Sequence, residues 1–589
     1  MTELNLPTAK PTATPSWLAR LTLGDLLLFL LLCAAAILRL ANLGAIPLSP
    51  SEAEQALAVW LFWSPEVTTA PSTSAGQAAS LSPAYFTFSS LLLQIMPDSD
   101  AAMRLVPVLF GLSLIFLPWL LRHQLGSVGA LTTSFLLAVS PLQTAVSRTA
   151  SGDAIALFCL MLLYVSWQNY CTTGKASWLF TLAIAVGLGL TSAPLFYTGL
   201  LPFVVVLLAG LFGKPLPNAE ADEMKTAVIL LVTTFAASAT ALLLNPAGLG
   251  DTARLLASWL AGFTAAPFQG SLNTLLTLLR YEILIVTFSL VAIIWLVATS
   301  QKTSGSGLLL WAGGVLVLLL IQQGTANAAL VLVLPLALLA GEQAAVLLRR
   351  LPSRAAIALA IGLFVAGLLF VGNFLRFTRQ VAFNAQALSG AWIAILIFCF
   401  AVITIYFVWT VQETAAYQGA WLGLLSIMFV ITWGTGWQLT QRAANDPRER
   451  WVQQATDDDL FVIVNMLEDV SHEATRTRNG LEIFSTVDTP TMRWYLRNFE
   501  NATIGSTLPQ PAGAAVLLTS AITEPQSDQP YVGIDFSHTR QPTVGAGSAT
   551  VDRMLRTIRW WAFHETTAVF NEERLVLWLR ADLIAPEGN

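Results

Sequence analysis

The residues whose types and spacing could first support chemistry are two carboxylates, Glu52 and Glu54, in the stretch 47–57, which reads PLSPSEAEQAL. A carboxylate acts as a general base when it lies within hydrogen-bonding distance of the proton that it removes. The same stretch fits a simpler role, in which Ser51 caps an interfacial helix and the two acids complement its dipole. Residue chemistry alone favours the structural role and leaves both open.

Two further groups of ionisable residues lie at the edges of long apolar stretches. Arg148 and Asp153 flank one edge, and Arg280, Tyr281 and Glu282 open another. Ionisable groups at membrane depth are costly and mark candidate functional sites, and a guanidinium matches the geometry of a phosphate. The structural alternatives are an acid in the first turn of a helix, an arginine that reaches lipid headgroups, and an anchor at the interface.

The sequence contains no spacing that indicates a bound metal. The acidic run 457–459 has three consecutive carboxylates, which point in different directions on a helix and fit a helix N-terminus better. His123, His472, His538 and His564 are scattered and form no ligand pattern. We therefore expect no metal site, and the sequence requires no cofactor, while it leaves room for a divalent cation.

The framework that must position these residues is unusually apolar. Of the 589 residues, 55% are hydrophobic and only 11% are charged, whereas soluble domains carry about 25% charged residues. The mean hydropathy is +0.66. This composition predicts a polytopic membrane protein, and the net charge of −5 without a basic run argues against a nucleic-acid partner.

Apolar stretches of about 20 residues, the length that crosses a bilayer, predict a mainly α-helical bundle of about thirteen spans. These stretches centre on 26–43, 103–121, 127–146, 150–167, 177–193, 196–213, 226–245, 278–299, 307–322, 328–347, 355–375, 391–410 and 419–438. The stretch 83–96 is apolar but short, which fits a re-entrant or interfacial helix.

Charge distribution divides the chain into three parts. We expect a cytoplasmic segment at 1–24, a multi-span membrane domain at 25–440 with large outer loops at 44–102 and 246–277, and a soluble domain at 441–589. With thirteen spans, all five lysines fall on the cytoplasmic side; they are Lys10, Lys175, Lys214, Lys225 and Lys302. An odd number of spans then places the C-terminal domain outside the plasma membrane.

The C-terminal 149 residues hold 33 of the 65 charged residues and have the pattern of a small α/β domain. We predict a helix at 457–473 and strands at 481–485, 515–518 and 575–579. The Gly-, Thr- and Ser-rich stretch 540–550 predicts a loop. By analogy, this domain recognises substrate or forms a lid.

The order of several short motifs resembles the GT-C glycosyltransferases, the group of protein mannosyltransferases and aminoarabinose transferases. The motifs of the membrane domain are Leu38-Arg39-Leu40, Ser51-Glu52-Ala53, Ser82-Pro83-Ala84-Tyr85, Ala102-Met103-Arg104 with Pro107, Ser140-Pro141 and Ser147-Arg148 with Asp153. Later motifs resemble a branch related to proteins linked to archaeal protein glycosylation; they are Tyr281-Glu282, Leu334-Pro335, Trp451-Val452, Met492 to Arg497 and Arg559-Trp560-Trp561.

This resemblance implies an integral membrane glycosyltransferase of the cell envelope. Its donor would be a polyprenyl-phosphate sugar, and its acceptor a lipid, a glycan or a protein at the extracytoplasmic face. Glu52 would be the base, with Glu54 as a substitute, and Asp153 would orient the sugar or the acceptor. The substrate and phosphate ligands would come from Arg104, Arg148, Arg280, Tyr281 and Glu282.

The sequence departs from the pattern of this family at two places. Ser51 stands where the family has an aspartate, its proposed base. The stretch 322–327 reads QQGTAN where the branch has a charged pair. Two alternatives therefore stay open, namely a catalytically degenerate GT-C-fold protein that assists glycan assembly and a flippase or transporter of lipid-linked glycans. The second alternative would show inverted repeats and midplane charges, and we find neither.

Overall fold

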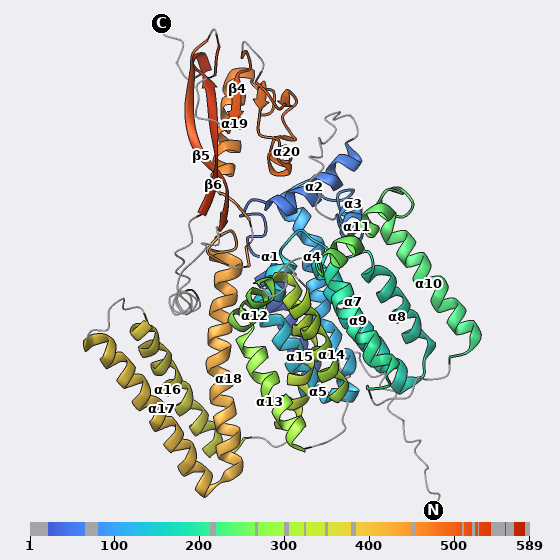
Figure 1. Ribbon diagram of the computed structural model, residues 1–589, viewed down its shortest axis with the longest axis vertical. Coiled ribbons are helices and arrows are strands. Elements are labelled where there is room, and N and C mark those ends of the chain that lie inside the picture. Colours follow the sequence, from blue (N-terminus) through green and yellow to red (C-terminus); the bar gives the residue numbers. More distant parts are fainter. Residues whose placement is uncertain are drawn as a thin grey trace, which may run out of the picture.

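The computed structural model describes residues 22–64, 81–212, 219–264, 269–299, 305–322, 326–347, 352–378, 385–449, 451–452, 454–508, 512–520, 525–527, 529–542, 560 and 570–583. These residues form a long helical bundle with a smaller domain, built on a β-sheet, at one end (Figure 1). The mainly helical fold with a C-terminal sheet agrees with the prediction from sequence.

The bundle is built from eighteen α-helices in the described part of the chain. They are α1 (Leu23–Leu40), α2 (Pro50–Trp63), α3 (Pro83–Leu92), α4 (Asp100–Phe116), α5 (Arg122–Val139), α6 (Pro141–Ser147), α7 (Asp153–Thr173), α8 (Ala176–Gly189), α9 (Pro194–Leu208), α10 (Ala221–Ala239), α11 (Gly248–Ala261), α12 (Gln269–Tyr281), α13 (Ile283–Thr299), α14 (Gly305–Ile321), α15 (Ala329–Leu347), α16 (Arg354–Thr378), α17 (Ala385–Val411) and α18 (Glu413–Trp437). Short helical turns, η2 (Leu117–Leu121), η3 (Ala326–Ala328) and η4 (Gln438–Arg442), join some of them.

Seven helices of the described residues are long and apolar enough to cross a membrane, and the bent pair α12–α13 would make an eighth. They do not confirm the predicted number of thirteen. Three predicted spans correspond to α8, α9 and α14, which have 14, 15 and 17 residues. At ~1.5 Å per residue these helices are shorter than the ~30 Å hydrocarbon core of a bilayer. A fourth, 278–299, is bent by 96° where α12 meets α13.

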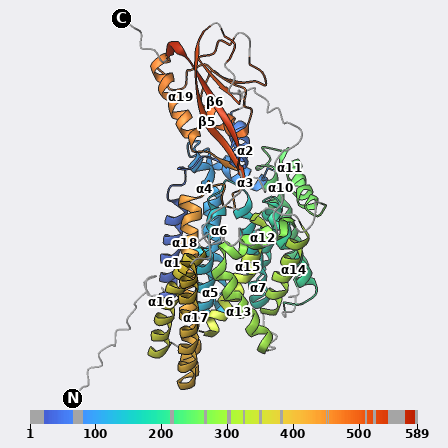
Figure 2. The same ribbon diagram turned by 60° about the vertical axis from the view of Figure 1, so that its left-hand side comes forward.

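Packing within the bundle is uneven. α7 and α15 are the most deeply buried of the long helices, whereas α16 and α17 expose most of their apolar surface. Figures 1 and 2 show α16 and α17 beside α18, at the edge of the bundle. An exposed apolar helix surface is the expected interface with lipid in a membrane protein. The core that positions the ionisable residues therefore lies around α7 and α15.

The described parts of the two predicted outer loops lie at the end of the bundle that faces the sheet domain (Figure 2). The first loop contains α2 and α3, and the second contains α11. The short apolar stretch at 83–96 contains α3, a helix of 10 residues, which at ~1.5 Å per residue is too short to cross a bilayer.

Two lysines mark the opposite end of the bundle. Lys175 follows α7, a helix of 21 residues that begins at the sheet-domain end, and Lys225 lies in the first turns of α10. The other three lysines, Lys10, Lys214 and Lys302, lie outside the described residues, as does most of the predicted segment 1–24.

The C-terminal domain contains a six-stranded mixed sheet with the strand order β1-β5-β6-β4-β2-β3. Its elements are β1 (Ala455–Thr456), α19 (Asp459–Thr475), β2 (Ile483–Ser485), α20 (Pro490–Leu496), β3 (Ala502–Ile504), β4 (Val516–Thr519), β5 (Tyr531–Pro542), β6 (Phe570–Arg580) and the turn η5 (Ala581–Leu583). β2 pairs in parallel with β3 and β4, and the remaining pairs are antiparallel.

The predicted helix and the three predicted strands of this domain are present as α19, β2, β4 and β6. Strand β5 was not predicted, and it extends to Pro542, so the predicted loop at 540–550 begins inside a strand. Residues 543–550 lie outside the described residues. A signal for β5 was present in the sequence, because Ile534 and Phe536 alternate with Asp535 and Ser537, a pattern that is typical of a half-exposed strand.

A fully buried arginine joins three helices near the sheet-domain end. Arg39, in the last turn of α1, donates through Nε to the Ser147 hydroxyl of α6 at 3.0 Å. Its other nitrogens donate to the backbone carbonyls of Leu137 and Ala138 at the end of α5. On the far side of Ser147, α4 approaches so closely that only Gly111 fits. This junction fixes α6 and the loop that follows it.

We predict that Gly111→Ala lowers the thermal stability of the protein in detergent. The added Cβ would lie 2.4 Å from Cβ of Ser147, and because neither atom is the end of a flexible side chain, α4 and α6 must move apart. Overpacking of this kind costs roughly 1–3 kcal/mol. The matched control is Gly362→Ala in α16, where an added Cβ meets nothing within 4 Å. Equal melting temperatures for the two variants would contradict the prediction.

Candidate active site

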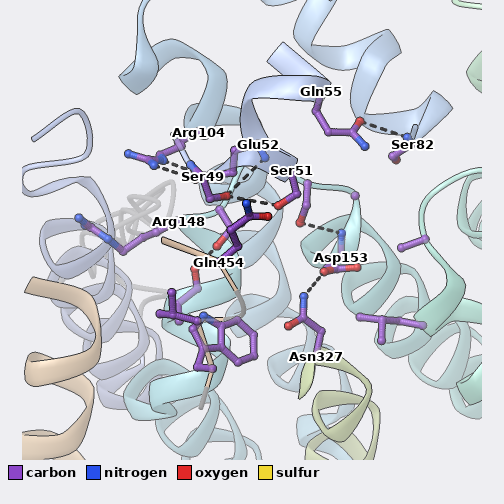
Figure 3. Close-up of a pocket in the computed structure, with 18 of the residues that line it drawn as sticks. Ser49, Ser51, Glu52, Gln55, Ser82, Arg104, Arg148, Asp153, Asn327 and Gln454 are labelled. Carbon is purple, nitrogen blue, oxygen red and sulfur yellow. Dashed lines mark hydrogen bonds and ion pairs between the residues drawn. The ribbon is translucent and has the colours of Figure 1, made fainter. Parts of the chain in front are cut away.

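A cavity of about 760 Å³ lies where the bundle meets the sheet domain (Figure 3). Its walls come from the first loop and α2, from the start of α7, from α11, and from the segment that enters the sheet domain. The polar residues that line it include Ser49, Ser51, Glu52, Gln55, Ser82, Arg104, Arg148, Asp153, Thr198, Trp259, Gln322, Asn327, Asn445, Gln454 and Gln541. Four of the eight predicted site residues are therefore brought together in one place.

Glu52 reaches this cavity because of the way in which α2 begins. The Ser49 hydroxyl accepts from the backbone N–H of Glu52, and the Glu52 carboxylate accepts from the backbone N–H of Ser49 at 3.0 Å. This is a reciprocal capping box, with Pro50 in the first helical position. The sequence suggested Ser51 as the cap; the structure corrects this to Ser49 and leaves Ser51 exposed on the cavity wall.

Arg104 holds both oxygens of the Glu52 carboxylate. Its Nε donates to Oε1 at 2.9 Å and its Nη2 to Oε2 at 2.8 Å, and both side chains are buried. The same guanidinium also donates to the backbone carbonyls of Leu43, Ile46 and Pro47. Arg104, on α4, thus fixes the first loop and the start of α2 together.

The backbone N–H of Ala150 donates to Glu52 Oε1 at 2.8 Å. The carboxylate therefore accepts four hydrogen bonds, two from Arg104 and one each from the backbone N–H groups of Ser49 and Ala150. Burial alone would raise the pKa of Glu52, but Arg104 and the backbone donors of Ser49 and Ala150 hold that pKa below its ordinary value. A carboxylate held in this way is a weak base and has no oxygen available for an acceptor proton. Its geometry suits a structural role.

Asp153 is the other carboxylate on the cavity wall. It occupies the first position of α7, and Asn327 donates to its Oδ2 at 2.5 Å. Figure 3 shows the two side chains pointing toward each other. Among the described residues no cation pairs with Asp153. Its partial exposure to the cavity leaves it accessible to a substrate, in contrast with Glu52.

Arg148 supplies a positive charge that no described carboxylate compensates. Its guanidinium donates to four backbone carbonyls at the end of α1, those of Leu38, Arg39, Ala41 and Asn42, at 2.7–3.3 Å. Burial and then Arg104 lower the pKa of Arg148 to about 10, so it remains cationic at neutral pH. Arg148 lines the main cavity and also a second cavity of about 380 Å³ beside it.

The remaining predicted site residues do not line the cavity. Glu54 is half-buried on α2 and lies outside its walls. Arg280 and Tyr281 are buried at the end of α12, where Tyr281 donates its hydroxyl proton to the buried Glu449 and Arg280 Nη1 lies 3.5 Å from the Thr435 hydroxyl. Their contacts connect the bent helix pair with the segment that leads to the sheet domain.

Glu282 lies at the bend between α12 and α13 and is also fully buried. Its Oε1 accepts from the Ser140 hydroxyl at 2.6 Å and from the backbone N–H of Leu142 at 3.0 Å. A carboxylate at a helix N-terminus satisfies backbone donors that have no partner in the helix. Glu282 thus caps the N-terminus of α6, the helix that leads to Arg148. It supports the cavity wall through α6 and does not line the cavity.

The sequence did not single out a polar cluster around Trp259. Its indole N–H donates to the Thr198 hydroxyl at 2.9 Å, and its backbone carbonyl accepts from Gln322 Nε2 at 2.7 Å. Gln322 and Asn327 belong to the stretch that departs from the family pattern. The sequence does show amide side chains between two apolar stretches. It could not show their partners, because these lie on α7, α9 and α11, which are distant in sequence.

Within the described ranges, no group of three or more His, Cys, Asp or Glu side chains is close enough to hold a metal ion. The acidic run 457–459 instead begins α19, where Asp457 pairs with Arg540 at 2.8 Å and Asp459 accepts from the backbone N–H of Ser537. The chemistry available in the cavity thus consists of one accessible carboxylate, one uncompensated guanidinium and many neutral hydrogen-bonding groups.

Comparison with known proteins gives one family match and a set of structural neighbours. Residues 80–234 match the family described as dolichyl-phosphate-mannose-protein mannosyltransferase. No curated protein matches the chain. The matched range contains α3 to α9 and most of α10, and it includes Arg104, Arg148 and Asp153.

The fold is similar to that of ArnT from Cupriavidus metallidurans. The crystal structure of ArnT bound to undecaprenyl phosphate has a TM-score of 0.53 and 14% sequence identity, over 95% of this chain and 99% of that chain. The apo form has a TM-score of 0.50 with the same identity and coverage. The Archaeoglobus fulgidus oligosaccharyltransferase in its apo form has a TM-score of 0.41 and 12% identity, over 85% and 66% of the two chains. The similarity to ArnT shows a GT-C-like membrane fold, and together with the family match it agrees with the GT-C resemblance of the motifs in the membrane domain.

The ion pair between Glu52 and Arg104 makes a prediction about stability and pH. Glu52→Gln leaves the buried guanidinium of Arg104 without its counter-charge, and breaking a buried pair costs about 3–5 kcal/mol. Because the folded pKa of Glu52 is lower than the unfolded one, the ion pair stabilises the fold above the ordinary glutamate pKa of about 4.3 and is lost as pH falls through the lowered value.

Melting temperatures of the wild type and of Glu52→Gln, measured from pH 7 to pH 3, therefore differ most at neutral pH and converge in acid. Glu482→Gln, at an exposed glutamate of the sheet domain, is the matched control and melts with the wild type throughout. A constant difference between the wild type and Glu52→Gln over the whole range would contradict the role given to the pair.

Proposed function

We propose that this protein is an integral membrane glycosyltransferase that transfers a sugar from a polyprenyl-phosphate donor to an acceptor hydroxyl or amine. The observation that supports the proposal most strongly is a pair of charged side chains in one cavity, each without a described partner of opposite charge. Arg148 is a cation that lacks a described counter-carboxylate, and Asp153 is a carboxylate that lacks a described counter-cation. Such a cation could bind an anionic leaving group, and such a carboxylate could accept the proton of an acceptor.

In the proposed reaction, the acceptor oxygen or nitrogen attacks the anomeric carbon of the donor sugar while the bond from that carbon to the phosphate oxygen breaks. Asp153 takes the proton of the acceptor, which requires a distance of about 2.6–3.2 Å in the reacting complex. Arg148 stabilises the negative charge that develops on the departing polyprenyl phosphate. Proton and charge are both accounted for, so the step needs no further reactant.

Glu52 and Arg104 have positioning roles in this proposal, in place of the base and phosphate ligand expected from sequence. Their side chains are hydrogen-bonded to each other and to backbone groups of the first loop, and Glu52 also accepts from the backbone N–H of Ala150 between α6 and α7. Asn327 orients the Asp153 carboxylate through its hydrogen bond. Ser51, exposed on the same wall, is a hydroxyl that can contact the sugar or the acceptor.

The lipid nature of the donor is supported by the GT-C-like fold and by the position of the cavity. ArnT, which shares the fold, was crystallised with undecaprenyl phosphate. The cavity lies at one end of an apolar bundle, where a phosphate can meet protein while its prenyl chain stays in the bilayer. The acceptor would be a lipid, a glycan or a protein that reaches the cavity from the side of the sheet domain.

We place this end of the molecule on the extracytoplasmic side of the plasma membrane. Lys175 and Lys225 lie at the end remote from the sheet domain, and lysines near the ends of spans are retained on the cytoplasmic side. Both large loops and the C-terminal domain then face outward.

A second candidate function is that of a non-catalytic GT-C-fold protein that assists glycan assembly. The observation that favours it is the exposed Ser51, at the position where the family has its proposed base, next to a Glu52 that is fully paired. The two candidates differ in whether Asp153 has a chemical role, which a single substitution tests.

We expect Asp153→Asn to lower the transfer rate about 10²–10⁴-fold, because the amide cannot accept the acceptor proton, and to leave binding of polyprenyl phosphate unchanged. The measurement is transfer from radiolabelled polyprenyl-phosphate sugars by the purified protein. Asp222→Asn, at an exposed acid of the lysine-bearing end, is the control and keeps the wild-type rate. Failure of the wild type to transfer from any such donor would favour the non-catalytic candidate.

Removing the uncompensated charge should weaken binding of the lipid phosphate. We expect Arg148→Gln to raise the Kd for undecaprenyl phosphate in nanodiscs roughly 10-fold or more, which is a loss of about 1.4 kcal/mol. Arg148→Lys should have a smaller effect because it keeps the charge but loses the planar donor fork.

The control for this measurement is Arg254→Gln. Arg254 is an exposed arginine on α11, at the same end of the molecule, and it pairs with Asp251 instead of lining the cavity. If Arg148→Gln binds the lipid as tightly as Arg254→Gln does, the phosphate does not contact Arg148.

A further inference from the structure

The sheet domain contacts the first loop of the bundle through α20. Asp100, the first residue of α4, accepts from the Trp494 indole N–H at 2.8 Å and from the Tyr495 hydroxyl at 2.5 Å. Burial and then Asp100 raise the pKa of Tyr495, so the hydroxyl keeps its proton and remains a donor. α20 is thus attached to α4, the helix that carries Arg104.

A second anchor lies one turn further along the chain. Arg497 donates to the Asp98 carboxylate at 3.0 Å and to the Asp98 backbone carbonyl at 2.8 Å, and its guanidinium lies 3.7 Å from the centre of the Trp494 ring. A guanidinium with this many partners fixes the orientation of the two elements as well as their distance. The sheet domain is therefore held in one position on the bundle.

Both backbone polar groups of Leu48, its N–H and its carbonyl, are hydrogen-bonded to side chains of the sheet domain. The backbone N–H of Leu48 donates to the Tyr495 hydroxyl at 2.8 Å, and its carbonyl accepts from the Thr456 hydroxyl at 2.8 Å. Leu48 is fully buried, so water cannot replace either partner. Tyr495 serves twice, because it accepts from Leu48 while it donates to Asp100.

Leu48 directly precedes Ser49, the cap of α2. On the bundle side, Arg104 holds the carbonyls of Ile46 and Pro47 and the carboxylate of Glu52. The segment 46–52 is thus held from two directions, by α4 of the bundle and by two side chains of the sheet domain. The residues that it presents to the cavity, Ser51 among them, take their position from both.

We propose that Tyr495 and Thr456 are positioning residues of the active site. They fix Leu48 and through it the first turn of α2, so the sheet domain determines the geometry of one cavity wall. This inference rests on the proposed transferase function and adds a role for the C-terminal domain. Sequence alone suggested only substrate recognition or a lid.

Arg148 and Asp153 belong to the α6–α7 segment, and no described hydrogen bond or ion pair joins either of them to Tyr495 or Thr456. Arg148 is held instead by backbone carbonyls at the end of α1. Loss of Tyr495 or Thr456 contacts should therefore misplace the α2 wall while the phosphate site stays intact. The expected signature is a fall in kcat without a change in KM for the donor.

The test compares Tyr495→Phe and Thr456→Val with Thr456→Ser in the full-length protein. The first two variants keep the size of the side chain and remove the hydroxyl, and the third keeps the hydroxyl. We expect kcat to fall at least 10-fold in Tyr495→Phe and Thr456→Val with donor KM within twofold, and to recover in Thr456→Ser. Tyr531→Phe is the matched control, because this buried tyrosine of the same domain donates to the Ala514 carbonyl far from the cavity.

Amide hydrogen exchange of the segment 46–52 gives a second readout that does not depend on activity. We expect exchange at Leu48 to become at least 10-fold faster in Tyr495→Phe than in Tyr531→Phe. If exchange and kcat are the same in these two variants, the inference is wrong. If the wild type transfers no sugar at all, the proposed function fails, and faster exchange in Tyr495→Phe still supports the coupling while unchanged exchange overturns it.

Discussion

The structure depends on one buried ion pair, that between Glu52 and Arg104. Charges are rare in this apolar chain, and burying two of them is stable only when each is paired and fully hydrogen-bonded. The pair meets this condition by drawing in the backbone of Ser49, Ala150 and the loop before α2. As a result, three segments that are distant in sequence are held in one arrangement around the cavity; they are the first loop with the start of α2, α4, and the loop between α6 and α7.

This pairing also decides which charges remain for chemistry. Of the four ionisable residues on the cavity wall, two neutralise each other, and Arg148 and Asp153 remain without a described partner of opposite sign. Arg148 is held by carbonyls at the end of α1, and Asp153 by Asn327. A wall of neutral serines and amides surrounds them, which suits a polyhydroxylated substrate. In the function that we propose, the proton transfer is assigned to Asp153 and does not require a carboxylate at position 51.

The C-terminal domain is closely integrated with the bundle. Side chains of α20 and β1 reach the first loop, and Trp560 donates to the Arg448 carbonyl beside Glu449, the partner of Tyr281. The residues at the α12–α13 bend, which the family pattern suggested as phosphate ligands, connect helices within this same framework. They shape the cavity by supporting α6 and the segment before the sheet domain.

The sequence by itself determined the membrane class, the division between an apolar bundle and a charged C-terminal domain, the GT-C resemblance and a short set of ionisable candidates. These properties depend on the sequence alone. Each residue contributes its own free energy of transfer from water to lipid, and each short motif is recognised by its residues and its place along the chain. It could not tell that Glu52 is occupied whereas Asp153 is accessible, or that Arg280, Tyr281 and Glu282 lie outside the cavity. Only the tertiary structure decided this, because the state of a charge depends on partners such as Arg104, Asn327 and Tyr495 that long-range packing brings within 3 Å.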